Sequence, residues 1–215
     1  DRFVAAFAGA LNKLRVAPEA HAEIGAVQNL AQLAIVEDHV ADALAQGAKL
    51  VAGGARTGSG FGYRPTALDH CNEAMKVVSD ETFGPVVAIV RVADAEEAVR
   101  RANQSRYGLN GSVWTRDLAR GERLARQLEV GVAHVNGHAW TGGTLAEAPW
   151  TGVKETGPGV AASRHAYATF ARPRTLMIDK NRNPEAFWYP YDDDYDAFTK
   201  ALVERGKGRL SALLS

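Results

Sequence analysis

Residues 86–90 read Val-Val-Ala-Ile-Val and residues 94–97 read Asp-Ala-Glu-Glu, so an apolar run is followed closely by a helix start. The run is almost entirely apolar and β-branched, which is typical of a strand covered on both faces. Asp94 is a suitable N-cap, and Glu97 stands three residues later, as in a capping box. The stretch therefore predicts a strand over residues 86–90 and a helix over residues 95–102.

The alternation of strands and helices continues on both sides of this unit. Downstream, the pattern predicts a strand at 111–114, a helix at 117–128 and a strand at 131–135. Upstream, it predicts helices at 3–14 and 30–46 and a short strand at 49–52. Near the end, it predicts a helix at 162–170 and a strand at 174–179. Successive strand and helix units build parallel sheets, so we expect an α/β fold, with a parallel-type sheet, flanking helices and a C-terminal strand.

Composition describes an ordinary globular chain of 215 residues, 46% of them hydrophobic and 23% charged. Lys and Arg together number 25, as do Asp and Glu, so no net charge is available to attract nucleic acid or an anionic membrane. No apolar run is long enough to cross a membrane, and residues 1–20 do not resemble a signal peptide. The single cysteine fits a reducing compartment, so we expect a cytoplasmic protein.

The loop before the 86–90 strand carries an unusual set of side chains, Asp80-Glu81-Thr82-Phe83-Gly84-Pro85. A carboxylate can accept hydrogen bonds from both hydroxyls of a vicinal diol, and an aromatic face can cover a flat ring. On these residues alone, a solvated acidic pair and a Phe83 packed in the core are the simpler interpretation.

Other short motifs follow in a fixed order along the chain. They are Glu23-Ile24-Gly25-Ala26, Gly47-Ala48-Lys49-Leu50, Gly62-Tyr63, Ala102-Asn103, Tyr107-Gly108-Leu109, Val135-Asn136 and Pro149-Trp150-Thr151-Gly152-Val153-Lys154-Glu155-Thr156-Gly157. With the loop at 80–86, these motifs resemble the aldehyde dehydrogenase superfamily over about residues 1–180. The resemblance departs at Val160 and Ala161, where the family tends to carry an Arg-Glu pair.

The resemblance implies roles for several side chains. Glu81 would hydrogen-bond the nicotinamide-ribose hydroxyls of NAD or NADP, and Phe83 would lie against the nicotinamide ring. The 136–150 segment would contact the aldehyde substrate, and its candidate residues are Asn136, His138, Trp140 and Trp150. Hydrophobic packing of a long loop is an equally good interpretation of the tryptophans.

The resemblance also indicates what the 215 residues lack. The family's nucleophilic Cys, its general base and its dinucleotide-binding half all lie upstream of the segment matched here. We therefore expect the C-terminal half of an NAD(P)-dependent enzyme that oxidises an aldehyde to a carboxylic acid through a Cys thioester, and we expect the chain alone to be inactive. Two alternatives remain open: a non-catalytic lid or oligomerisation module, and reduction of acyl-CoA or acyl phosphates.

Three further patterns are interpreted as structural. Cys71 has acidic neighbours that disfavour a thiolate, so we interpret it as a loop thiol and not as the nucleophile. The glycines of residues 58–62 lead into an extended segment and not into a helix, which argues against a phosphate-binding loop. His134 and His138 belong to a predicted strand and its end, so we expect no metal site there.

The C-terminal region is expected to serve assembly. We predict a catalytic-domain portion over residues 1–171, an oligomerisation strand over 172–180 and a tail over 181–215. By resemblance, the strand joins a neighbouring subunit's sheet in a homodimer or homotetramer. In the tail, an aromatic cluster at 187–191 precedes Asp192-Asp193-Asp194, which is suited to start a short helix with Tyr195, Phe198 and Leu202 on one side.

Overall fold

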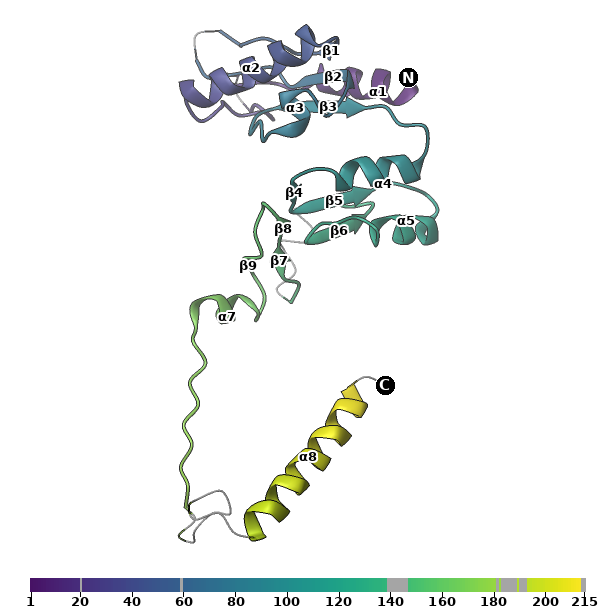
Figure 1. The fold of residues 1–215 in the computed structure, drawn as a ribbon. Coiled ribbons are helices and arrows are strands. Elements are labelled where there is room, and N and C mark those ends of the chain that lie inside the picture. The colour runs from purple at the N-terminus through teal and green to yellow at the C-terminus, as the bar shows by residue number, and fades with distance from the viewer. Residues whose placement is uncertain are drawn as a thin grey trace. The chain divides into compact units, whose positions relative to one another are not determined.

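The computed structural model describes the chain except for residues 20, 59, 139–146, 181, 183–188, 190–192 and 214–215. The described residues form two compact units, 1–171 and 172–215. Figure 1 shows the first unit as small sheets with helices packed against them, which is the α/β class expected.

The first sheet consists of strands β1 (Lys49–Ala52), β2 (Thr66–Cys71) and β3 (Val86–Val90), in that order. β1 runs antiparallel to β2, whereas β2 and β3 are parallel, with Thr66 opposite Val86. The predictions for β1 and β3 are confirmed residue by residue. Helix α1 (Arg2–Leu11) contacts β1 and β2 and ends three residues earlier than predicted.

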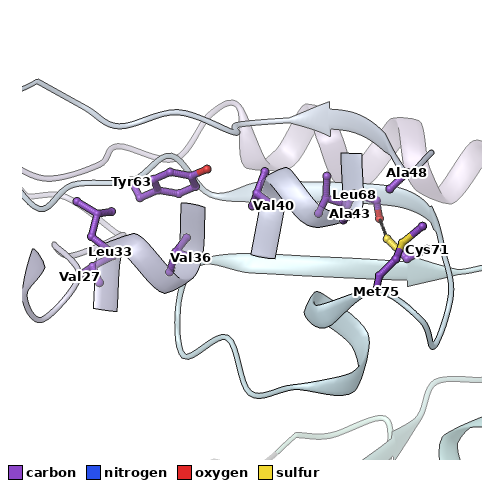
Figure 2. Packing of buried hydrophobic residues seen from close by; sticks show 10 residues of the cluster. All are labelled: Val27, Leu33, Val36, Val40, Ala43, Ala48, Tyr63, Leu68, Cys71 and Met75. Carbon is purple, nitrogen blue, oxygen red and sulfur yellow. Dashed lines mark hydrogen bonds between the residues drawn. The ribbon is translucent and has the colours of Figure 1, made fainter. Parts of the chain in front are cut away.

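Helix α2 (Leu30–Ala45) supplies much of the core of this region. Asn29 caps its start, because the Asn29 side chain accepts a hydrogen bond from the Gln32 backbone N–H at 2.9 Å. Leu33, Val36, Val40 and Ala43 recur at helical spacing and are buried. Figure 2 shows these side chains beside Val27, Ala48, Tyr63, Leu68, Cys71 and Met75.

Two strand-and-helix units follow the first sheet. They comprise α4 (Ala95–Asn103), β4 (Tyr107–Gly108), β5 (Asn110–Val113), α5 (Leu118–Ala125) and β6 (Val132–Val135), whereas α3 (Lys76–Ser79) lies earlier, between β2 and β3. Asp94 caps α4 as predicted, accepting from Glu97 N–H at 2.7 Å, and Glu97 bonds back to Ala93 N–H at 2.8 Å. β5 and β6 are parallel, in accordance with the predicted crossover through α5.

The parallel strand pairs predicted by this alternation of strands and helices are divided between two sheets in the structure. β5 and β6 form a sheet of their own, separate from β1, β2 and β3. In the chain after α4, β4 pairs antiparallel with β8 (Val153–Lys154), matching Tyr107 with Lys154. This pairing connects the start of β5 to the 150–157 segment and not to β3.

The remaining elements are short except for the last helix. β7 (Trp150–Thr151) pairs antiparallel with β9 (Val160–Ala161), and α7 (Ala166–Phe170) starts four residues later than predicted. Among the described residues, 172–180 form no strand within the chain, whereas α8 (Asp193–Leu213) is longer than the short helix expected. None of the described helices combines the length and apolar character that crossing a membrane requires.

Candidate functional site

The loop of residues 80–85 connects α3 to β3 and is hydrogen-bonded at both ends. Asp80 N–H donates to the Lys76 carbonyl at 2.8 Å, and the Pro85 carbonyl accepts from Thr66 N–H at 2.7 Å. The second bond attaches the loop to the first residue of β2, directly before the parallel register of β2 and β3 begins. The loop is therefore held by secondary structure on either side, although its own residues form neither helix nor strand.

Helix α2 holds the middle of this loop. The Gln32 side-chain amide donates to the Thr82 carbonyl at 2.7 Å. The His39 Nδ1 atom lies 3.0 Å from the Thr82 hydroxyl oxygen. At Gly84, a Cβ atom would overlap the Val36 side chain, so the backbone approaches the helix as closely as only glycine allows. We did not single out Gln32, His39 or Thr82 from the sequence; the available signal was His39, a polar residue within an apolar helical stripe.

Phe83 is held in an uncommon conformation and is exposed. Its backbone φ is +49°, a left-handed value that costs a non-glycine residue conformational energy. Its side chain is 73% exposed, so the expectation that core packing holds this ring does not apply here. Phe83 lines a pocket of about 280 Å³ together with residues 24–28, Gln32, Gly84 and Pro85. An open hollow beside an aromatic ring suits a flat ligand.

Glu81 is exposed two residues before Phe83, and it forms no ion pair with any other described residue. Its neighbour Asp80 instead pairs with Arg106, at 3.0 Å between Oδ1 and Nη2. The interpretation of both acids as a solvated pair therefore applies to Glu81, whose side chain is exposed, but not to Asp80, which pairs with Arg106.

The predicted substrate-contact residues fall into different environments. Asn136, at φ +55°, accepts from Thr115 N–H and donates to the Thr115 carbonyl, both at 2.8 Å. This reciprocal pair ties the end of β6 to the chain after β5. His138 is exposed two residues further on, and Trp140 lies outside the described residues.

Trp150 begins β7 and is half-buried. It lines a second pocket, of about 270 Å³, with Leu109, the segment 151–152 and residues near β9 and α7. The structure thus places an aromatic side chain on a concave surface near the predicted substrate loop, but the described residues bring it together with neither Glu81 nor Phe83 in one pocket.

Lys154, within the 149–157 motif, is bonded to several backbone groups. Its ammonium donates to the Asn103 carbonyl at 2.7 Å and to the Ser105 carbonyl at 3.1 Å, and it lies 3.2 Å from a Glu129 carboxylate oxygen. The carbonyls belong to the end of α4 and the turn after it. The lysine therefore joins three segments, which is a structural role that the motif alone did not reveal.

Cys71 is not a loop thiol, which corrects the expectation from the sequence. It ends β2, is 4% exposed, and its Sγ atom lies 3.5 Å from the Leu68 carbonyl (Figure 2). Burial raises the pKa of this thiol above its ordinary value, and the charge of Asp69 adds to the increase. A buried thiol with a raised pKa is a poor nucleophile, which adds a reason to expect that Cys71 is not catalytic.

Comparison with known proteins shows to which family the chain belongs. Residues 1–176 match the aldehyde dehydrogenase family model, and the chain belongs to that family. The chain is 33% identical over 228 residues to a 4,4'-diapolycopene aldehyde oxidase of Methylomonas sp, covering 98% of the chain and 41% of that protein. It is 35% identical over 167 residues to a betaine aldehyde dehydrogenase of Bacillus subtilis, covering 74% and 33%.

A solved structure agrees with the sequence comparison. The crystal structure of a Mycobacterium tuberculosis aldehyde dehydrogenase complexed with NAD+ superposes with a TM-score of 0.77 at 31% identity, covering 86% of this chain and 38% of that one. The chain therefore spans about one third to two fifths of the length of these relatives.

Proposed function

We propose that the complete protein carrying this chain is an NAD(P)-dependent aldehyde dehydrogenase, which oxidises an aldehyde to a carboxylic acid. The observation that supports this most strongly is the loop at 80–85. It exposes a carboxylate and an aromatic ring two residues apart, beside a pocket, and holds the ring at a left-handed φ. Strain of this kind is concentrated at sites that act on ligands.

The two side chains fit the two parts of a nicotinamide riboside. The Glu81 carboxylate can accept hydrogen bonds from two adjacent ribose hydroxyls, and the open face of Phe83 can cover the nicotinamide ring. When bound, NAD or NADP supplies the hydride acceptor for aldehyde oxidation. In this reaction, the chain orients the nicotinamide ring and excludes water from one of its faces.

The reactive cysteine is proposed to lie outside these 215 residues. The chain contains one cysteine, and it is buried with a raised pKa. The general base and the dinucleotide-binding half are proposed to come from the same missing part, since the matched relatives are two to three times longer. By this proposal, the isolated chain orients a cofactor but cannot form the Cys thioester.

The substrate loop is proposed to lie between Asn136 and Trp150. Asn136 anchors its start to Thr115, and Trp150 contributes an aromatic surface to the second pocket. His138 and Trp140 belong to the same loop in sequence. We propose that this loop contacts the substituent of the aldehyde substrate. Asn136 holds the loop in place, and the aromatic residues touch the substrate.

Residues 172–180 are proposed to form an intersubunit strand in a homodimer or homotetramer. Leu176, Met177 and Ile178 are each more than 70% exposed, which is costly for three consecutive apolar side chains in water. Pairing with the edge of a neighbouring sheet would cover them and satisfy the backbone groups of this segment.

The test compares the complete protein with the 215-residue chain. Each is incubated with a small aldehyde and either NAD+ or NADP+, and reduced cofactor is followed by absorbance. We expect formation by the complete protein and none by the chain. Cofactor binding by the complete protein without any turnover would instead support the non-catalytic lid or assembly module. Turnover by the isolated chain would contradict the placement of the nucleophile.

The Cys71→Ser variant of the complete protein is expected to keep its aldehyde oxidation rate within about twofold, because Cys71 is buried and protonated. The rate is measured at saturating aldehyde and cofactor. Iodoacetamide labelling of the 215-residue chain is a control, with at least about tenfold slower reaction in the folded than in the urea-unfolded state. Loss of turnover in a folded variant would mean that Cys71 takes part in the chemistry.

A further inference from the structure

One face of helix α2 is in contact with two residues of the 80–85 loop, Thr82 and Gly84. Gln32, Val36 and His39 are spaced by four and three residues, so they lie on the same side of the helix. Gln32 reaches the Thr82 carbonyl, His39 reaches the Thr82 hydroxyl, and Val36 lies against Gly84. Phe83 lies between these attachment points.

His39 is unusual within this face. It is 7% exposed, and it occurs next to Val40 and one turn from Val36, both buried. A buried imidazole needs a hydrogen-bond partner, and Thr82 Oγ1, at 3.0 Å from Nδ1, provides one. Thr82 is half-buried, and both its carbonyl and its hydroxyl are bonded to α2.

The positions of these bonds connect them to the exposed side chains. Glu81 precedes Thr82 and Phe83 follows it. Because the carbonyl and the hydroxyl of Thr82 are both bonded to α2, the two neighbouring side chains have fewer directions in which to point. The left-handed backbone of Phe83 is a conformation that a free loop would leave, because alternatives of lower energy exist. Bonds to a helix that is itself packed in the core can maintain it.

We propose that His39 and Gln32 are positioning residues for the nicotinamide cofactor, acting through Thr82 to aim Glu81 and Phe83. This inference rests on the proposed function. It assigns to α2 a task in cofactor orientation beyond its role in the core. A small displacement of orienting groups lowers reaction rates strongly, so hydrogen bonds remote from the reacting atoms can have large kinetic effects.

The test uses Thr82→Val and His39→Phe, which keep side-chain size close to the original and remove the hydrogen bond. In the complete protein, each is expected to weaken NAD+ or NADP+ binding and to slow single-turnover hydride transfer by about tenfold. Because both changes break one interaction, the double variant should be little worse than either single variant. Thr82→Ser keeps the hydroxyl and is expected to restore near-normal rates.

Thr57→Val is the matched control. The Thr57 hydroxyl donates to the Ala17 carbonyl at 2.6 Å in a partly buried site that does not touch the 80–85 loop. Its loss should lower the melting temperature by an amount comparable to Thr82→Val, with cofactor binding unchanged. An equal kinetic effect of Thr57→Val would overturn the positioning role, since it would reduce the effect of Thr82 to general destabilisation.

Hydrogen exchange separates this inference from the proposed function. In the 215-residue chain without cofactor, the amides of residues 81–86 should exchange about tenfold faster in Thr82→Val and His39→Phe than in the original or in Thr57→Val. Unchanged exchange would overturn the positioning role even if the protein oxidises aldehydes. Faster exchange would support the hold of α2 on the loop even if the unsubstituted protein bound no nicotinamide cofactor, a result that would overturn only the proposed function.

Discussion

Replacement of Glu81 by alanine in the complete protein is expected to slow hydride transfer about 10- to 100-fold. Glu81 is exposed two residues before Phe83, which lines a pocket, and its carboxylate is proposed to accept two hydrogen bonds from the ribose. Hydrogen bonds to a charged group contribute roughly 1.5–3 kcal/mol each, and their loss also frees the ring to leave its reactive orientation. Single-turnover rates and equilibrium cofactor binding, measured together, separate orientation from affinity.

Asp80→Asn is the matched control for this variant. Asp80 is the adjacent carboxylate, but its side chain pairs with Arg106, and both are about half exposed. Exposed ion pairs contribute little to stability, so this change should leave hydride transfer within about twofold. If Glu81→Ala behaved like the control, the likeness of this loop to the family would be structural only, and the cofactor would be held elsewhere.

Replacement of Asp69 by alanine is expected to lower the free energy of unfolding by roughly 1.5–3 kcal/mol, the range for loss of buried hydrogen bonds to a charged group. Asp69 lies in β2 and is 4% exposed. It accepts from Arg91 at 3.0 Å and 2.7 Å and from His70 N–H at 2.8 Å. Removing it takes away the buried partner of Arg91, whose side chain is 40% exposed and keeps a second pair with Asp1 at 2.8 Å. Urea unfolding of the 215-residue chain, followed by circular dichroism, measures the change.

Glu37→Ala provides the comparison for a similar pair in a different environment. Glu37 binds Arg56 through two contacts of 2.6 Å, but both side chains are more than a third exposed. We therefore expect a loss below about 1 kcal/mol. Equal losses for the two variants would show that burial does not determine the strength of these ion pairs.

The Asp69 pair also predicts how stability depends on pH. The Arg91 guanidinium, by direct hydrogen bonding, lowers the pKa of Asp69 to about 2, whereas an unfolded chain has a value near 4. A carboxyl with a lowered folded-state pKa stabilises the fold above the unfolded value and loses that contribution as the pH falls. The stability difference between the original chain and Asp69→Ala should thus be constant above about pH 5 and shrink toward pH 2.

Sequence reasoning was most successful where a property depends on neighbouring residues. The strand at 86–90 and the cap formed by Asp94 and Glu97 follow from local preferences, and both are found as predicted. The parallel pairing of β5 with β6 follows from the helix between them. Family membership was also readable, because short motifs in a fixed order form a pattern that chance does not readily produce.

The reasoning was less successful where distant segments meet. Cys71 was interpreted as a loop thiol, but pairing of β2 with β1 and β3 buries it. β4 pairs with β8, nearly fifty residues away, and this pairing was not predicted from the sequence. The local sequence pattern of β4 does not identify its partner strand, since a short strand can pair with several strand edges.

The sequence by itself determined the family, the α/β class, the helix caps and the identity of Glu81 and Phe83 as candidate ligand-binding residues. The tertiary structure alone decided that Phe83 is exposed at a positive φ, that Thr82 is bonded to His39 and Gln32, and that Asp69 is buried against Arg91. The physical reason is range: caps and strand periodicity arise within a few residues, whereas burial and side-chain hydrogen bonds depend on which distant segments the core brings together.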